Sequence, residues 1–454
     1  MMLKIFLLCG WLFSTDSVPL GETTAGNSQV LTLDECIGYA IKHNPLRTKQ
    51  EAQSRMYNIS RQEAVAGFLP SLSASFSVSS NFGRGVDPET NTYISTSTFG
   101  NSYSIYSQLT LFDGLSTFYN ASLAKINQLF GRQQLQNVKD QIALETMELY
   151  FNALYYKGTV AFAEQQLQES SDNLKSFQRM EELGMKAAPD VAEIRAKEAE
   201  DRYLLTQQRN LLKLEMIKLK EKMNFPIEDD FEIEQVNGNS PAGMVSAVSL
   251  DNTATIFNNA QTSLPKLLAS GQTLKATEAE YKIIRGRLFP TITLEAGFST
   301  GFSRLMDGTP YMSFKEQLKN RQGSYIGVGI SIPLFDRLSR PSEARRAKQR
   351  FVIARSEHEA AMRQVYSEIE QAVADVEGLK DETVSAMEKT VAMAEAHRVN
   401  VRKYEEGLIN AIELTTSANR LLNARVSELH AQLKYQLKYR LLNYYKGETT
   451  WTEF

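Results

Sequence analysis

The sequence predicts a mainly helical protein with a small strand component, built from two copies of one structural unit. Pro70 and Pro290 each precede a strand with alternating side chains, and they lie 220 residues apart, as do Pro45 and Pro265. Downstream, a Leu-Phe-Asp turn and a glycine six residues before an acid also recur, now 223 residues apart. Each copy therefore reads as two helices, two strands and two long helices. Two copies of one supersecondary unit indicate a pseudo-symmetric molecule rather than two unrelated domains.

The repeat sets the expected boundaries along the chain. We assign 1–20 to a signal peptide, 21–224 to the first repeat, 225–252 to a connecting segment, 253–446 to the second repeat and 447–454 to a C-terminal tail. The apolar run from Ile5 to Phe13 behind Lys4 is typical of a secretory signal, with a buried N-terminal strand as the alternative. Without that segment the chain keeps Cys36 alone, and a single thiol makes no intrachain disulfide.

Composition excludes several classes of protein. An apolar content of 42% and a charged content of 23% are incompatible with wholesale disorder. A net charge of −3 gives no broad basic surface for nucleic acid, so no nucleic acid partner is expected. After Phe13 there is no run of eighteen apolar residues, so any membrane span must be made of strands.

Four segments alternate between apolar and small polar residues. Their apolar sides consist of Leu72, Ala74, Phe76 and Val78; Tyr103, Ile105, Leu109 and Leu111; Ile292, Leu294, Ala296 and Phe298; and Ile326, Val328, Ile330 and Ile332. Segments of about ten residues with this pattern suit a barrel wall that faces lipid outward and water inward. A soluble sandwich with one solvated face is the alternative.

Four strands are too few to close a barrel. An open sheet in lipid would leave two rows of unpaired backbone groups, each costing several kcal/mol. Two chains would supply eight strands, too narrow for a water channel, whereas three chains supply twelve and leave a lumen. The strands therefore predict a homotrimer with outer-membrane lipid around it, and irregular polar loops at 83–101 and 304–323.

Long stretches without proline predict long helices in both copies. The segment 115–182 would form a rod of roughly 100 Å. In the second copy, apolar or small residues recur at steps of three and four, which favours coiled-coil packing; they are Ala344, Ala347, Phe351, Ala354, Val365, Ile369, Ala372, Val376, Leu379, Val384, Met387, Val391 and Ala394. Each pair of helices turns at a hinge marked by Gly184 or Gly407.

No catalytic or metal chemistry is expected. The motif Gly297-Phe298-Ser299-Thr300-Gly301 matches that of hydrolase nucleophiles, but alternation continues through it with no start of a helix, so Ser299 is not a nucleophile. Met362 stands where a zinc-binding histidine would follow His358-Glu359, and the other histidines are scattered. We therefore expect no enzyme activity, no metal site and no cofactor.

With these motifs in this order and present twice, the chain resembles the TolC family of outer-membrane efflux channels. The residues that carry the resemblance are Leu31-Thr32-Leu33, Ala40, Asn44-Pro45, Phe68-Leu69-Pro70, Phe289-Pro290, the turns at Leu111-Phe112-Asp113 and Leu334-Phe335-Asp336, and the two hinge glycines. The resemblance implies a trimer in which twelve strands form an outer-membrane barrel and twelve helices form a periplasmic tunnel, the α-barrel. It also implies that the connecting segment helps to form a belt around that tunnel.

The resemblance further implies an entrance constricted at the hinge ends. By position, Tyr404 matches the tyrosine of the family's entrance network, Asp190 its aspartate and Glu413 the first acidic ring. Ile409 and Thr416 depart from the family, because they stand where an arginine and a second acidic ring would be. The alternative role for Asp190 and Glu413 is to cap the helices near whose N-termini they lie.

The function that the resemblance implies is a passive duct in a tripartite efflux or type I secretion system of a Gram-negative bacterium. Its partners would be a periplasmic adaptor protein, docked at Gly184 and Gly407, and an inner-membrane pump of the RND or ABC type. The chain has no phosphate-binding loop, so energy would come from the pump. Drugs, metals and proteins are all compatible with the sequence as substrates, and a periplasmic coiled-coil scaffold is the alternative function.

Overall fold

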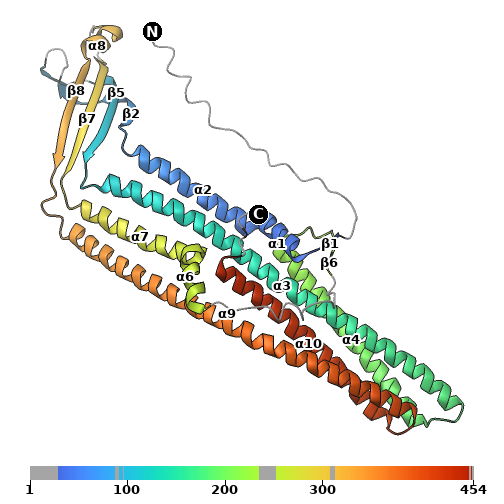
Figure 1. Ribbon diagram of the computed structural model, residues 1–454. Helices are drawn as coiled ribbons and strands as arrows, with labels where there is room; N and C mark the ends of the chain where they lie inside the picture. The colour runs from blue at the N-terminus through green and yellow to red at the C-terminus, as the bar shows by residue number, and fades with distance from the viewer. Residues whose placement is uncertain are drawn as a thin grey trace.

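The computed structural model describes residues 29–86, 91–95, 97–234, 252–306, 312–448 and 451. Long helices run side by side from a small β-sheet at one end to two hairpin turns at the other (Figure 1). The predicted class, mainly helical with a small strand part, is confirmed. The predicted signal peptide lies outside the described residues. Among the described helices, none has the length and apolar character needed to cross a membrane.

The two halves of the chain contain matching elements. The first half has α1 (Leu33–His43), α2 (Pro45–Ala66), β2 (Ser71–Asn81), β5 (Thr98–Phe112), α3 (Ser116–Glu182) and α4 (Ala188–Met223). The second half has α6 (Thr253–Ser263), α7 (Pro265–Gly286), β7 (Thr291–Leu305), β8 (Gly323–Ser331), α9 (Ser339–Glu405) and α10 (Ala411–Lys446). Because α3 and α9 contain 67 residues each, and α4 and α10 contain 36 each, the two hairpins are the same length.

Local signals fix where the first helices begin. Thr32 and Glu35 form a capping box at the start of α1, in which the Glu35 carboxylate accepts from the Thr32 backbone amide at 2.8 Å. Asn44 caps α2 by accepting from the Leu46 amide at 2.9 Å, and Pro45 occupies the first helical position, where its missing N–H costs nothing. The Asn-Pro pair in the sequence is therefore a helix boundary.

The four long strands form one antiparallel sheet in the order β2-β5-β7-β8. Its register keeps apolar side chains on one face, with Ile105 opposite Phe298 and Leu294 opposite Val328. The described residues leave much of this face uncovered, because Leu72 on β2 is 76% exposed and Ile326 on β8 is 75% exposed. Within the described chain, β2 and β8 are the edges of this sheet and have one strand partner each.

The predicted irregular loops are partly wrong. The strands β5 and β7 extend further than expected, β3 (Arg84–Val86) pairs with β4 (Tyr93–Ser95), and α8 (Phe314–Asn320) follows β7. Ser313 and Glu316 form a capping box that starts α8. The side-chain oxygen of the buried Gln317 accepts from the Ser303 amide at 3.1 Å. Helix α8 therefore supplies a hydrogen-bond partner for the backbone of β7 beyond Ser299, the last residue that pairs with β8.

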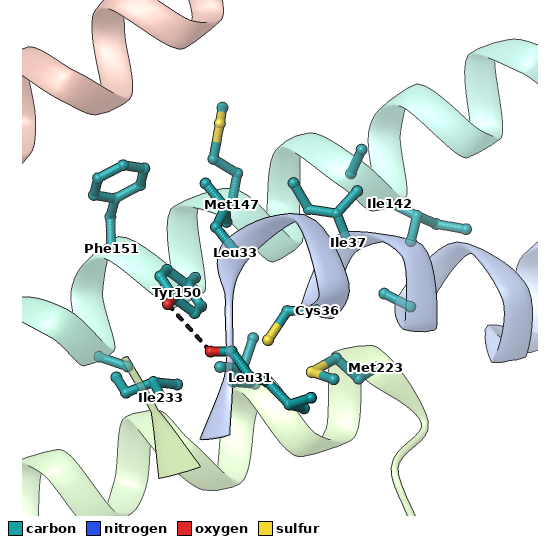
Figure 2. Packing of buried hydrophobic residues seen from close by; sticks show 14 of the residues in the cluster. Leu31, Leu33, Cys36, Ile37, Ile142, Met147, Tyr150, Phe151, Met223 and Ile233 are labelled. Carbon is teal, nitrogen blue, oxygen red and sulfur yellow. Dashed lines mark hydrogen bonds between the residues drawn. The ribbon is translucent and has the colours of Figure 1, made fainter. Parts of the chain in front are cut away.

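A hydrophobic cluster at mid-length joins the start of the chain to the first hairpin. Strand β1 (Gln29–Leu31) pairs in parallel with β6 (Phe231–Ile233), and α1 packs its apolar side against α3 and α4. Figure 2 shows Tyr150 within this cluster, where its hydroxyl donates to the Leu31 carbonyl at 3.3 Å. Cys36 is buried here, and burial raises the pKa of its thiol to about 12. Most of the predicted connecting segment, residues 235–251, lies outside the described part of the chain.

The predicted seam of α9 is correct up to Leu379 and wrong beyond it. Val365, Ile369, Ala372 and Val376 are buried, and they form a second cluster with α6 and α10. Nearer the hinge, Thr383 and Ala386 are buried instead, whereas Val391 is 72% exposed. The predicted series contains a five-residue step, from Leu379 to Val384. Because residues on one face of a helix recur every three or four positions, this step places the residues after Leu379 on a different face.

Candidate functional site at the hairpin ends

The two hairpin turns have the same backbone geometry. After α3, the amides of Gly184 and Met185 donate to the carbonyls of Glu181 and Met180, both at 2.8 Å. After α9, the amides of Gly407 and Leu408 donate to the carbonyls of Tyr404 and Lys403 at 3.0 and 2.8 Å. Gly184 and Gly407 have φ values of +72° and +76°, the left-handed conformation that terminates a helix and favours glycine.

The helices that leave these turns start in different ways. Pro189 lies in the first turn of α4, where Asp190 is placed favourably for the positive end of the helix dipole. At the start of α10, Asn410 accepts from the Glu413 amide at 2.9 Å and is the capping residue. The suggested capping role of Glu413 is therefore filled by Asn410, and the Glu413 side chain is exposed with no polar partner in the described chain.

Tyr404 is buried in a contact between the two hairpins. Its ring stacks on Phe177 of α3 with 5.2 Å between centroids and 12° between planes. The ammonium group of Lys186, in the turn between α3 and α4, lies 4.5 Å from the Tyr404 centroid, a cation–π geometry. Burial raises the pKa of Tyr404, Lys186 opposes the rise, and the charge of Asp190 adds to it.

The structure thus brings some of the predicted entrance residues together and leaves one apart. Tyr404 and Asp190 are close enough to interact electrostatically across the two hairpins. Glu413 points to solvent from the first turn of α10. Gly184 and Gly407 mark the two tips. The role of these residues in constricting an entrance stays a prediction.

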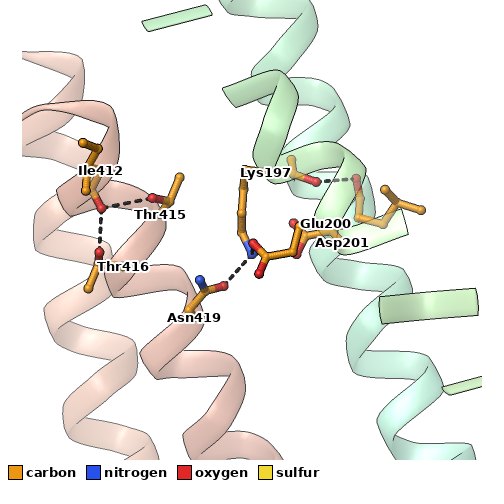
Figure 3. A network of polar contacts seen from close by, with 9 residues as sticks. Lys197, Glu200, Asp201, Ile412, Thr415, Thr416 and Asn419 are labelled. Atoms are coloured by element: carbon orange, nitrogen blue, oxygen red, sulfur yellow. Dashed lines mark hydrogen bonds and ion pairs between the residues drawn. The ribbon is translucent and has the colours of Figure 1, made fainter. Parts of the chain in front are cut away.

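Ile409 and Thr416, which depart from the TolC-like pattern, need no polar partner from another helix. Ile409 packs against the apolar cluster formed by Phe177, Val191, Ile194, Tyr404, Ala411 and Leu414. The Thr416 hydroxyl donates to the Ile412 carbonyl at 2.7 Å, within its own helix (Figure 3). In this chain the contact between hairpins is therefore mainly apolar and aromatic.

A buried ion pair lies further along the hairpins, on α4. Figure 3 shows Lys197 reaching Asp201 on its own helix, with 2.6 Å between Nζ and Oδ1, and also Asn419 on α10. Lys197 and Asp201 are both buried. Because a buried charge needs fixed partners, the contact of Lys197 with Asn419 restricts how α4 sits against α10.

A cleft of about 880 Å³ lies among the ends of α3, α4, α9 and α10. His397 lines it and shares a hydrogen bond of 2.9 Å between Nδ1 and the Ser417 hydroxyl oxygen. Burial lowers the pKa of His397, Glu169 opposes the change and Arg425 adds to it.

Sequence reasoning missed Phe177, Lys186, Lys197, Asp201 and His397. The spacing of Lys197 and Asp201 by four residues signals an ion pair on a helix, but it gives no sign that the pair is buried. Lys186 and Tyr404 meet only because two hairpins that lie far apart in the sequence pack together. No local pattern contains that information.

The Gly297–Gly301 motif lies inside β7, where Ser299 pairs with Ser104 and Gly323 on the neighbouring strands. A hydrolase nucleophile requires a sharp turn from strand to helix, so this serine does not have the geometry. In the described residues, no three potential ligand side chains gather into a group that would hold a metal ion.

Comparison with known protein families gives a match for part of the chain. Residues 256–447 match the profile of the family described as outer membrane efflux protein, and this range corresponds to the second repeat. The second repeat therefore resembles the outer membrane efflux proteins in sequence. The predicted TolC-like resemblance is confirmed, and so is the predicted location in the outer membrane.

Similarity to individual outer membrane proteins extends over almost the whole chain. The outer membrane efflux protein BepC of Brucella suis biovar 1 (strain 1330) is 22% identical over 452 residues, which cover 97% of this chain and 91% of BepC. The outer membrane protein VceC of Vibrio cholerae has a TM-score of 0.75 at 14% identity, covering 91% of this chain and 96% of VceC. The CmeC outer membrane channel of Campylobacter jejuni has a TM-score of 0.76 at 12% identity, covering 96% of this chain and 95% of CmeC. The fold is therefore that of VceC and CmeC.

The burial of His397 predicts a pH dependence of stability. Because the pKa of the folded protein lies below the ordinary value of 6.5, the unfolded chain binds more protons as the pH falls. The contribution of His397 to stability is therefore complete above about pH 7.5 and is lost as the pH falls through about 6.5. Melting temperatures at pH 7.5 and 6.0 should differ less in His397→Gln than in the wild type.

Ser417→Ala is the matched control for this prediction. It removes the hydrogen bond to His397 but keeps the imidazole, so it should lower the melting temperature at both pH values and keep the wild-type difference. An equal pH effect in the wild type and in His397→Gln would contradict the prediction.

Proposed function

We propose that the protein is a passive trimeric duct: the outer-membrane channel of a tripartite efflux or type I secretion system. The observation that carries this proposal is the four-stranded sheet, which in the described residues has an exposed apolar face and two edge strands with one strand partner each. In lipid, such a sheet is stable only if its edges pair with other copies of the chain. Three copies would supply twelve strands, with the apolar face toward lipid and the polar face toward a lumen.

The long helices support the same assembly. Helix α7 packs between α3 and α9 and buries seven residues, whereas its counterpart α2 packs mainly against α3 and buries Ser54 alone (Figure 1). Ile59 on α2 is 63% exposed, but Ala279, at the matching position of α7, is 5% exposed. A second copy of the chain would cover α2 with its α9, just as α3 and α9 cover α7 within one chain.

The repeat also predicts how two copies would pair at the edge of the sheet. Within one chain, Ser104 of β5 faces Ser299 of β7. Their counterparts in the other repeat are Gly327 of β8 and Ser79 of β2. The same pairing across a junction between copies places Ser79 opposite Gly327 and Ser75 opposite Ser331. With the polar face inward, this register would continue the lumen surface around the assembly.

In this arrangement the strands cross the outer membrane, and the helices extend about 100 Å into the periplasm. The hairpin ends, with Gly184 and Gly407 at their tips, would face the inner membrane. There a periplasmic adaptor would dock and an RND or ABC pump would deliver the substrate. Adaptor contact would open the entrance by separating the hairpins at Tyr404, where Phe177 and Lys186 hold them together.

The exposed Glu413 is the residue most suited to act on passing ions. Three copies around a narrow entrance would concentrate negative potential, attract cations and bind divalent ions as plugs. Asp190, which lies near Tyr404, would add to the negative potential at the entrance. A periplasmic coiled-coil scaffold remains the alternative function, and it would leave the apolar strand face without an explanation.

The first test concerns assembly. Ile59→Lys would place three charges in the proposed junctions between α2 and α9 and should shift the detergent-solubilised protein from trimer to monomer in light scattering. The control is Gln62→Lys, because the matching residue in α7 is an exposed lysine, Lys282, and this change should leave the trimer intact. Equal trimer content in both variants would contradict the proposed junction.

The second test concerns conduction. The purified protein in planar bilayers should give discrete single-channel currents, and Glu413→Ala should weaken their block by divalent cations on the hairpin side by about ten-fold. Absence of conductance in both forms would contradict the duct. Recovery of the protein from the aqueous fraction, rather than from outer membranes, would favour the scaffold.

A further inference from the structure

The four described strands place a single residue of charged type on the polar face of the sheet. Serine, threonine, glycine, asparagine, glutamine and tyrosine occupy almost all of its positions on β2, β5, β7 and β8. Among the strand residues with side chains on this face, all of them described, Glu295 of β7 is the only Asp, Glu, Lys, Arg or His. Outside the strands, Arg321 donates to the Ser303 hydroxyl, eight residues along β7 from Glu295. Its half-buried carboxylate accepts from the Thr293 hydroxyl at 3.4 Å.

Two tyrosines flank this carboxylate from the neighbouring strands. In the register, Tyr106 of β5 and Tyr325 of β8 both face Gly297, two residues along β7 from Glu295. A Cβ atom on Gly297 would lie 2.4 Å from Cε1 of Tyr325, so the tyrosine ring lies across the glycine. Tyr106 is close enough to interact electrostatically with both Glu295 and Tyr325.

The surroundings leave this group accessible. Gly327 faces Glu295 on β8, and no atom lies within 4 Å of where its Cβ would be. Tyr325 is 56% exposed in the single chain. A carboxylate beside accessible aromatic faces is the combination that recognises organic cations, because the charge attracts the cation and the rings stabilise it through cation–π contacts.

We propose that Glu295, Tyr106 and Tyr325 form a binding site for organic cations on the lumen face of the sheet. The inference rests on the proposed duct, which turns this face toward the transport path and repeats the site three times around it. Glu295 supplies the charge, and the two tyrosines favour cations that carry apolar or aromatic groups over small inorganic ones. A purely structural role for Glu295 is the outcome that the experiment below separates from this one.

The experiment uses the full trimer in planar bilayers, in the Glu413→Ala background so that charge at the hairpin ends does not contribute. Two quantities are measured: the K⁺/Cl⁻ permeability ratio in a KCl gradient near 10 mM, and block of the current by tetraphenylphosphonium. Glu295→Gln should lower the permeability ratio about two-fold or more and weaken the block. Both effects should fade near 1 M salt, where the Debye length falls from about 30 Å to about 3 Å.

Two further variants separate charge from aromatic contact. Tyr325→Leu should weaken the tetraphenylphosphonium block about two- to five-fold and leave the permeability ratio unchanged. The double variant Glu295→Gln with Gln108→Glu moves the carboxylate to the facing position on β5 and should restore the permeability ratio, which a structural role of Glu295 would not allow.

The outcomes distinguish this inference from the proposed function. Absence of conductance would overturn the duct itself. Conducting channels in which Glu295→Gln leaves both the permeability ratio and the block unchanged would overturn the cation site alone. A block that is equally strong in the wild type and in Tyr325→Leu would overturn the role of the aromatic ring.

Discussion

Unpaired backbone at the two edges of the sheet is the constraint on which the rest of the structure depends. The chain contributes four long strands whose apolar face is uncovered, and β2 and β8 each keep a row of hydrogen-bonding groups without a strand partner in the described chain. In the proposed duct, lipid would offer these groups no water, and the sheet would have to continue into another copy of the chain. Repetition within the chain already defines the geometry of that continuation, because β5 and β7 pair as β8 and β2 of two copies would.

The long helices also have a surface that another copy of the chain would cover. Packing of α7 between α3 and α9 shows how a helix of this type is covered, and the bare surface of α2 shows where the coverage is missing. At the hairpin ends the proposed duct makes a different demand, because contacts there would have to hold two hairpins together and still allow them to separate. An aromatic stack with a cation above it, as at Phe177, Tyr404 and Lys186, meets both demands without a dense network of buried ion pairs.

The sequence predicts the elements well because their signals are local. Alternation of apolar and polar residues predicts the strands, stretches without proline predict the long helices, and the glycines Gly184 and Gly407 predict the hinges. Two failures were misread local signals: the capping box of Ser313 and Glu316 marks the start of α8, and the five-residue step after Leu379 put the predicted seam of α9 on the wrong face. The other failures concern tertiary contacts, such as the one between Gln317 and the β7 backbone. For the same reason, the meeting of Lys186 with Tyr404 and the burial of Lys197 with Asp201 have no signature in the sequence.

The pairing of β2 with β8 of a neighbouring copy is the most direct test of this account. The variant Ser75→Cys with Ser331→Cys places two thiols in the predicted register, and oxidation in outer membranes should yield covalent trimers on a non-reducing gel. The variant Ser79→Cys with Ser331→Cys, about 13 Å out of register, should stay monomeric. Monomers alone in the first variant, or cross-linking that is equal in the two, would contradict closure of the sheet by copies of the chain.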